Sequence, residues 1–107
     1  MKISQYEIVI VNLDPTIGSE IKKTRPCVVV SPNEINDYLR TIIIAPITSK
    51  SKNYPTRIEI KVKGKKNWVV IEQIRTIDKR RVYKKVGNLT GAEISEVKKV
   101  IKETFVD

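Results

Sequence analysis

The chain has 107 residues, with 21 lysines and arginines against 12 aspartates and glutamates, for a net charge of +9. This length suits a single domain, residues 1–107, with one hydrophobic core. Because the sequence has no histidine and only one cysteine, Cys27, it excludes internal disulfides, His- or Cys-based metal sites and histidine-dependent catalytic triads. The positive charge favours a polyanionic partner, either nucleic acid or an acidic protein.

The sequence also predicts where the protein is found. Residues 1–5 lack the apolar stretch of a signal peptide, and no segment approaches the ~20 apolar residues that a membrane span needs. We therefore expect a cytoplasmic protein with no membrane association, which agrees with the single cysteine. Cys27 lies in the apolar run 27–30 and is expected to be a small core residue.

Short β-strands dominate the predicted structure. Apolar residues on both faces predict central strands at residues 6–13 and 26–31, joined by a long basic loop. Residues 32–37 are predicted to form a turn. A third strand, 41–47, contains Pro46, which predicts a sheet edge or a bulge because proline cannot donate to the ladder. Alternation over 57–63, a turn at 64–67 and a returning strand at 68–74 predict a hairpin.

A last strand, 82–86, precedes a predicted C-terminal helix. Thr90 and Glu93 have the spacing of a capping box, and Leu89 and Ile94 occupy the positions of the accompanying hydrophobic staple. The helix carries an apolar stripe expected to pack on the barrel or on a partner subunit: Ile94, Val97, Ile101 and Phe105. Five to seven short strands followed by one helix predict a partly closed antiparallel β-barrel.

Several acid, guanidinium and hydroxyl groups lie at or beside the predicted strand ends. RNA carries its own nucleophile, the 2′-hydroxyl, so an enzyme needs only to orient it, move protons and stabilise the phosphate. An arginine can bind the phosphate oxygens in a bidentate manner, a hydroxyl can donate to them, and a carboxylate can act as base if burial raises its pKa. Arg25, Thr48, Glu20 and Glu72 can supply these parts with no cofactor and no metal.

Each of these residues also has a purely structural interpretation. Arg25 can be a surface charge at a strand end, and Thr48 an ordinary loop residue. Glu72 and Arg75 can form a structural ion pair. Trp68 suits packing in the core or at an interface, and it also offers a stacking surface for an unpaired base.

Four segments resemble the MazF/PemK family of toxin endoribonucleases from bacterial toxin–antitoxin systems. They are residues 11–20 (VNLDPTIGSE), 24–30 (TRPCVVV), 45–49 (APITS) and 72–79 (EQIRTIDK), in the family's order and spacing. The resemblance extends over nearly the whole chain. It implies an SH3-like antiparallel β-barrel with a C-terminal α-helix, working as a homodimer. It also implies sequence-specific, metal-independent cleavage of single-stranded mRNA, leaving 2′,3′-cyclic phosphate and 5′-hydroxyl ends.

The resemblance implies roles for individual residues. Arg25 and Thr48 match the principal catalytic positions, and Glu20 and Glu72 match acids implicated in some members. The RNA-binding residues would be Ser19, Lys22, Lys23, Ser49, Lys50, Gln73 and Arg75. This chain departs from some members at Ser19 and Val70, where they carry histidine and arginine, and at Lys22 and Lys23, where many carry glycine.

A cognate antitoxin is also implied, with an acidic, disordered tail that would cover the RNA groove. The net charge of +9 suits both RNA and such a tail. Two other functions stay open. One is a non-catalytic toxin of the CcdB kind that acts on DNA gyrase, and the other is a barrel that binds RNA without cutting it.

Overall fold

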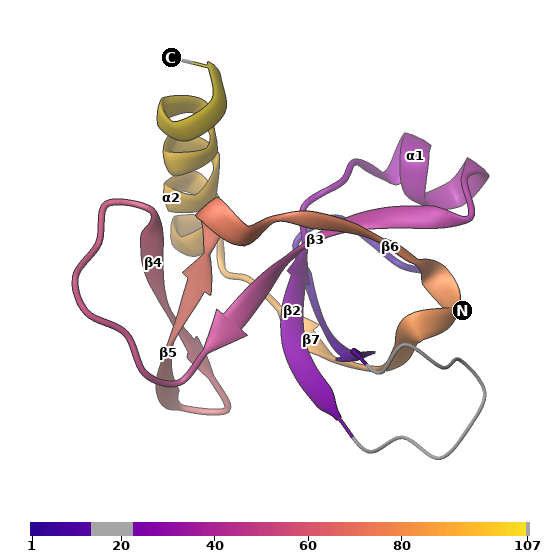
Figure 1. Cartoon of the computed structure of the whole chain (residues 1–107), viewed down its shortest axis with the longest axis horizontal. Coiled ribbons are helices and arrows are strands. Elements are labelled where there is room, and N and C mark those ends of the chain that lie inside the picture. The colour runs from indigo at the N-terminus through magenta and orange to yellow at the C-terminus, as the bar shows by residue number, and fades with distance from the viewer. Residues whose placement is uncertain (14–22, 107) are drawn as a thin grey trace.

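A computed structural model describes residues 1–13 and 23–106 of the chain (Figure 1). Its strands are β1 (Glu7–Asn12), β2 (Thr24–Val29), β3 (Thr41–Thr48), β4 (Arg57–Val62), β5 (Lys65–Val70), β6 (Arg75–Asp78) and β7 (Val82–Asn88). Its helices are α1 (Asn33–Tyr38) and α2 (Gly91–Ile101). Three short turns of helix complete it: η1 (Ile71–Gln73), η2 (Lys79–Arg81) and η3 (Lys102–Val106).

The strands form one antiparallel sheet in the order β4-β5-β3-β2-β1-β7. The sixth strand lies off this path, where β6 pairs with residues 41–44 of β3. Figure 1 shows the sheet curling into a half-barrel, with α2 beside the β4–β5 hairpin and α1 on the far side. The predicted mainly-β fold, with an antiparallel barrel-like sheet and a C-terminal helix, is therefore confirmed.

Alternate residues of the central strands pack on opposite faces of the sheet. On one face, Val28 and Ala45 belong to a core cluster that includes Val97 of α2. On the other face, Cys27 and Ile44 belong to a second core cluster. Burial raises the pKa of the Cys27 thiol to about 12, so this side chain stays protonated and acts as a core residue, as predicted.

The predicted turn at residues 32–37 is wrong, because residues 33–38 form helix α1. The sequence of α1 has no apolar stripe that would predict a helix, and a buried polar contact anchors it instead. The Asn36 side chain is buried, donates to the Ser31 carbonyl at 2.9 Å and accepts a hydrogen bond from the Ser31 hydroxyl. Ser31 Oγ in turn accepts from the Ile43 amide at 3.0 Å, which joins α1 to β3.

Of the two predictions for Pro46, a sheet edge or a bulge, the edge is wrong, and the register of β3 with β2 runs through Pro46 without a shift. Strand β3 is central, with Pro46 paired to Cys27 of β2 on one side. On the other side the partner of β3 changes, from β6 ending at Ile44 to β5 beginning at Ile47. Pro46 therefore lies in the gap between the two partners, where no amide donor is required.

The hairpin is confirmed with shifted boundaries. The tight turn is Lys63–Gly64 and not 64–67, and both residues have positive φ, 51° and 79°. That geometry matches a two-residue turn of type I′, which fixes the register of β4 and β5. Strand β5 ends at Val70, and the chain then turns through η1 into β6, a strand that the sequence did not predict.

The capping box of α2 is confirmed. Thr90 Oγ1 accepts from the Glu93 amide at 3.2 Å, and Glu93 Oε1 accepts from the Thr90 amide at 2.8 Å. Glu93 Oε2 also accepts from the Lys61 amide at 2.9 Å, which fixes the helix to β4. The predicted docking of the helix on the barrel is therefore confirmed.

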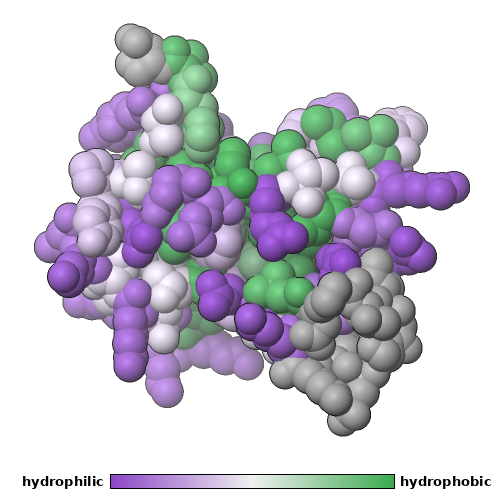
Figure 2. Space-filling model, viewed as in Figure 1, coloured by the Kyte–Doolittle hydropathy of each residue, from purple (hydrophilic) through white to green (hydrophobic). Residues whose placement is uncertain are grey.

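Only part of the apolar stripe packs on the barrel. Val97 and Val100 are buried, whereas Phe105, in the π-helical segment η3 that follows α2, is 51% exposed. Packing of this end on a partner subunit, the other predicted outcome, stays a prediction. Figure 2 shows apolar residues exposed at this end of the molecule.

Candidate functional site

Arg25 and Thr48 lie together because β2 and β3 are antiparallel neighbours. The register pairs Cys27 with Pro46, so that Arg25, two residues before Cys27, and Thr48, two residues after Pro46, both lie beyond the same end of the paired segment. Both residues line a surface pocket of about 360 Å³. The lining residues are Thr24, Arg25, Pro26, Ile47, Thr48, Ser49 and Asn67. The fold thus brings two predicted catalytic residues and one predicted RNA-binding residue, Ser49, to one site.

A second pocket of about 220 Å³ shares Arg25 with the first. It is lined by Leu13, Arg25, Cys27, Ile44, Pro46, Gln73 and Arg75. Arg25 therefore lies between the Thr48 pocket and a pocket that contains Gln73 and Arg75, two predicted RNA-binding residues. Both Arg25 and Arg75 are exposed, and within residues 1–13 and 23–106 neither forms an ion pair with a carboxylate. This pair of guanidinium groups can bind an anion such as a phosphate.

The Thr48 hydroxyl already has partners in the loop that follows it. It donates to the Lys50 carbonyl at 3.0 Å and accepts from the Lys50 amide at 3.3 Å. This local turn fixes the direction of the chain as it leaves β3. The hydroxyl must rotate away from the Lys50 carbonyl before it can donate to a bound phosphate.

Glu72 lines neither pocket. Its carboxylate accepts from Thr56 Oγ1 at 2.6 Å and from Arg57 Nη2 at 2.7 Å. The hydrogen bond from Arg57 lowers the pKa of Glu72 from 4.5 to about 2, helped by the one from Thr56. Burial acts in the opposite direction and raises the pKa, but the hydrogen bonds outweigh it and the net shift is downward, which is the reverse of the raised pKa expected of a carboxylate base. The partner of Glu72 is Arg57, which corrects the proposed pair with Arg75.

Arg57 organises the loop between Thr48 and β4. Besides Glu72, its guanidinium reaches Ser51 Oγ at 3.2 Å and lies 5.0 Å from the centre of the Tyr54 ring. These contacts attach loop residues 49–56 to η1. Arg57 is not among the predicted site residues, because in the sequence it is only the outward-facing residue of an alternating strand. The signal was the hairpin register, which sets Arg57 opposite Val70, two residues before Glu72.

The remaining predicted residues fall in different places. Ser19, Glu20 and Lys22 lie outside the described residues. Lys23 and Lys50 are exposed but line neither pocket. Trp68 is half-buried and paired opposite Thr48 across β5 and β3, so it borders the site and does not belong to the core.

Among residues 1–13 and 23–106, no three cysteine or acidic side chains gather in a way that could hold a metal ion. The same residues contain no helix with the length and apolar character needed to cross a membrane.

Comparison with known proteins agrees with this architecture. The chain superposes on a crystal structure of MazF from Deinococcus radiodurans with a TM-score of 0.80 and 23% identity, covering 100% of this chain and 99% of that one. It matches a mycobacterial endoribonuclease in complex with its cognate antitoxin with a TM-score of 0.83 and 15% identity, over 97% and 95% of the two chains. A MazE–MazF structure from D. radiodurans gives 0.79 and 20%, over 96% and 94%.

The sequence itself carries the family assignment. Residues 4–105 match the family described as PemK-like, MazF-like toxin of type II toxin–antitoxin system. The matched range includes every described residue of both pockets. The chain therefore belongs to the PemK-like, MazF-like toxins of type II toxin–antitoxin systems.

Proposed function

We propose that this protein is a sequence-specific endoribonuclease that cuts single-stranded mRNA without a metal ion and so stops translation and growth. The observation that carries the proposal is the meeting of Arg25 and Thr48 in one exposed pocket, with Arg75 in the adjoining pocket. The net charge of +9 supports binding of a polyanion. The products would carry 2′,3′-cyclic phosphate and 5′-hydroxyl ends.

The chemistry follows from the groups in the pocket. The phosphate of the cleaved linkage lies between Arg25 and Thr48, where the guanidinium binds two non-bridging oxygens and the hydroxyl donates to one. The 2′-oxygen forms a bond to phosphorus, and the bond from phosphorus to the 5′-oxygen breaks. We assign removal of the 2′-hydroxyl proton to Glu20, because Glu72 is held by Arg57 with a lowered pKa. The leaving 5′-oxygen takes a proton from the medium.

The first test is incubation of the purified protein, in EDTA, with a long single-stranded RNA and with its all-deoxy copy. The proposal expects discrete cuts in the RNA alone, and mapping their ends identifies the recognition sequence. Intact RNA with salt-sensitive binding would favour a barrel that only binds RNA. Growth arrest in cells whose mRNA stays intact would favour a gyrase-directed toxin of the CcdB kind.

We propose two protein partners. One is a cognate antitoxin with an acidic segment that neutralises the basic RNA-binding surface. The antitoxin complexes among the similar structures support it. The other is a second copy of this chain, supported by the exposed apolar end of the C-terminal helix, where Phe105 is 51% and Val106 is 70% exposed.

Changing Glu72 to glutamine is expected to leave kcat within about fivefold of wild type, because Glu72 is a structural partner of Arg57 and not the base. The loss should appear in stability. The lowered pKa means that the Glu72 carboxylate stabilises the fold above pH 4.5, and this contribution disappears as the pH falls towards 2. The difference in unfolding free energy between wild type and Glu72→Gln should therefore shrink between pH 5 and pH 2.

The measurements are single-turnover cleavage from pH 5 to 9 and urea unfolding at several pH values. Glu59→Gln is a matched control, since Glu59 is an exposed strand residue whose nearest cation, Lys66 Nζ, is 3.8 Å away. A loss of kcat of about 100-fold or more with a displaced pH profile would return Glu72 to the role of base.

A further inference from the structure

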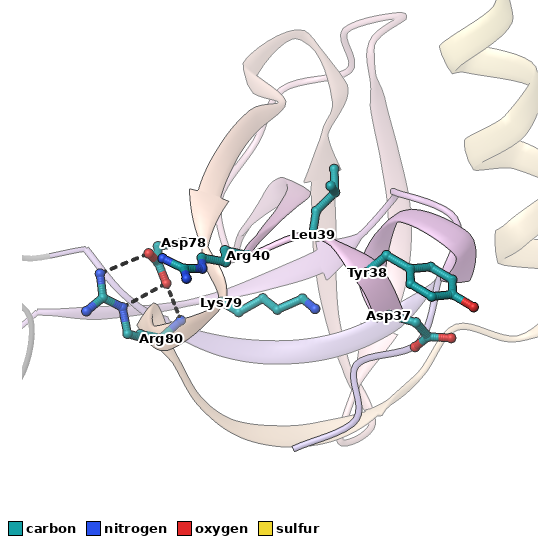
Figure 3. A pocket seen from close by; sticks show the side chains of 7 residues that line it. All are labelled: Asp37, Tyr38, Leu39, Arg40, Asp78, Lys79 and Arg80. Atoms are coloured by element: carbon teal, nitrogen blue, oxygen red, sulfur yellow. Dashed lines mark hydrogen bonds and ion pairs between the residues drawn. The ribbon is translucent and has the colours of Figure 1, made fainter.

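A third pocket lies at the other end of β3 from Thr48 (Figure 3). Its volume is about 490 Å³, larger than either pocket of the candidate site. Residues from the end of α1, the link between α1 and β3, and the β6–η2 junction line it: Asp37, Tyr38, Leu39, Arg40, Asp78, Lys79 and Arg80. We call it the α1–η2 pocket.

The pocket carries a small net positive charge, because Asp78 and Arg80 pair with each other and Arg40 and Lys79 then stand against the single carboxylate of Asp37. Arg80 binds Asp78 through two contacts, Nη2 to Oδ2 at 3.0 Å and Nε to Oδ1 at 3.1 Å, so these two charges offset each other. Arg40 and Lys79 form no ion pair within residues 1–13 and 23–106. The Lys79 amide donates to the Arg40 carbonyl at 2.9 Å, which keeps the two residues side by side.

An aromatic surface lies on the side of the pocket towards which Lys79 extends, whereas Arg40 lies on the Asp78 side (Figure 3). The Tyr38 ring is 85% exposed, and the neighbouring Leu39 is 51% exposed. Figure 3 shows the Lys79 side chain extending towards Tyr38 and Asp37. A solvent-exposed aromatic ring beside phosphate-binding cations is the arrangement with which proteins hold single-stranded nucleic acid, because every base has a face that can stack.

Strand β3 connects this pocket with the candidate site. Its eight residues run from Thr41, next to the pocket, to Thr48, a distance of about 23 Å at the usual strand rise. Arg75 lies between the two ends, paired opposite Ile44. Cations thus recur along β3, and the span is compatible with the four or more nucleotides, roughly, that small β-barrels of this kind bind.

We propose that the α1–η2 pocket is a distal subsite for the same single-stranded RNA, in which Tyr38 stacks on a base and Arg40 and Lys79 bind the adjacent phosphates. This inference rests on the proposed function. Its consequence is a length dependence, in which RNA that reaches the pocket binds more tightly than RNA that covers only the cut site.

The test compares binding of two RNAs centred on the mapped cut, of roughly four and twelve nucleotides, each with a single 2′-deoxy residue at the cleaved linkage. The double variant Arg40→Ala/Lys79→Ala should weaken binding of the long RNA about tenfold and reduce its salt slope by about 1.4, as expected for two lost phosphate contacts on a single strand. Its affinity for the short RNA and its kcat on short, uninterrupted RNA should not change. Tyr38→Ala should weaken only the long RNA, by about tenfold, with an unchanged salt slope.

A control variant, Lys98→Ala/Lys99→Ala, removes the same charge from the exposed face of α2. Equal losses on both RNAs, or losses no larger than those of the control, would overturn the distal subsite. So would a loss confined to binding of an acidic peptide, which would make the pocket a protein site. Wild type that neither binds nor cuts any RNA would overturn the proposed function itself, so the two failures are distinguishable.

Discussion

Replacing Arg25 with alanine should lower kcat for RNA cleavage by about 10²–10³-fold, the usual effect of removing one donor that stabilises a developing negative charge. Arg25 lies in both pockets of the site, is exposed, and has no carboxylate partner within residues 1–13 and 23–106. Its removal should therefore cost little stability. Single-turnover cleavage of the mapped RNA measures the effect, and thermal unfolding checks the fold.

Arg25→Lys separates charge from geometry. Lysine keeps the positive charge but lacks the planar fork, so only part of the activity should return. Lys98→Ala, on the exposed face of α2, is the control for a lost surface charge and should cut at the wild-type rate. If Arg25→Ala weakened RNA binding as much as cleavage, Arg25 would be a binding residue without a role in the transition state.

Replacing Thr48 with valine should lower kcat by about 10–100-fold with little change in KM, because a hydrogen bond made mainly in the transition state is lost while the shape is kept. Thr48→Ser retains the hydroxyl and should recover most of the activity. The measurement is steady-state cleavage of short RNA, with separate values of kcat and KM for each variant.

The Thr48 hydroxyl also holds the loop through Lys50, so a loop effect must be separated from a direct one. Ser51→Ala provides that control, since it removes the hydroxyl that accepts from Arg57 at 3.2 Å and leaves Thr48 in place. Ser51→Ala should cut within a few-fold of wild type. Equal losses in the Thr48→Val and Ser51→Ala variants would assign Thr48 a structural role in the loop.

Local patterns predicted the elements that local interactions hold. The hairpin followed from strict alternation over residues 57–63, and the start of α2 from the Thr90–Glu93 spacing. The sequence did not predict α1, because its anchor is the buried polar contact of Asn36 with Ser31 and not an apolar stripe. Strand β6 has one buried residue, Ile77, and exists through pairing with β3, more than thirty residues away.

The candidate site likewise has residues that the sequence predicted and contacts that only the folded structure shows. The resemblance identified Arg25 and Thr48, and the predicted strands placed each at a strand end, but only the folded structure, in which β2 and β3 are antiparallel neighbours, shows that they share a pocket. The role of Glu72 could not be predicted, because its partner Arg57 is fifteen residues earlier and reaches it only through the hairpin and the turn of η1. A carboxylate beside a site is thus bound by a neighbouring guanidinium, which lowers its pKa.

The most direct test of RNA-specific cleavage is a single 2′-deoxy substitution at the mapped cut, with the protein in EDTA. The account predicts that this RNA still binds but stays intact at that linkage, because the attacking nucleophile is missing. The matching all-ribose RNA should yield a 2′,3′-cyclic phosphate and a 5′-hydroxyl. Cleavage at the deoxy linkage, or products that carry a 5′-phosphate, would show that water or another nucleophile attacks the phosphate and would contradict the proposed mechanism.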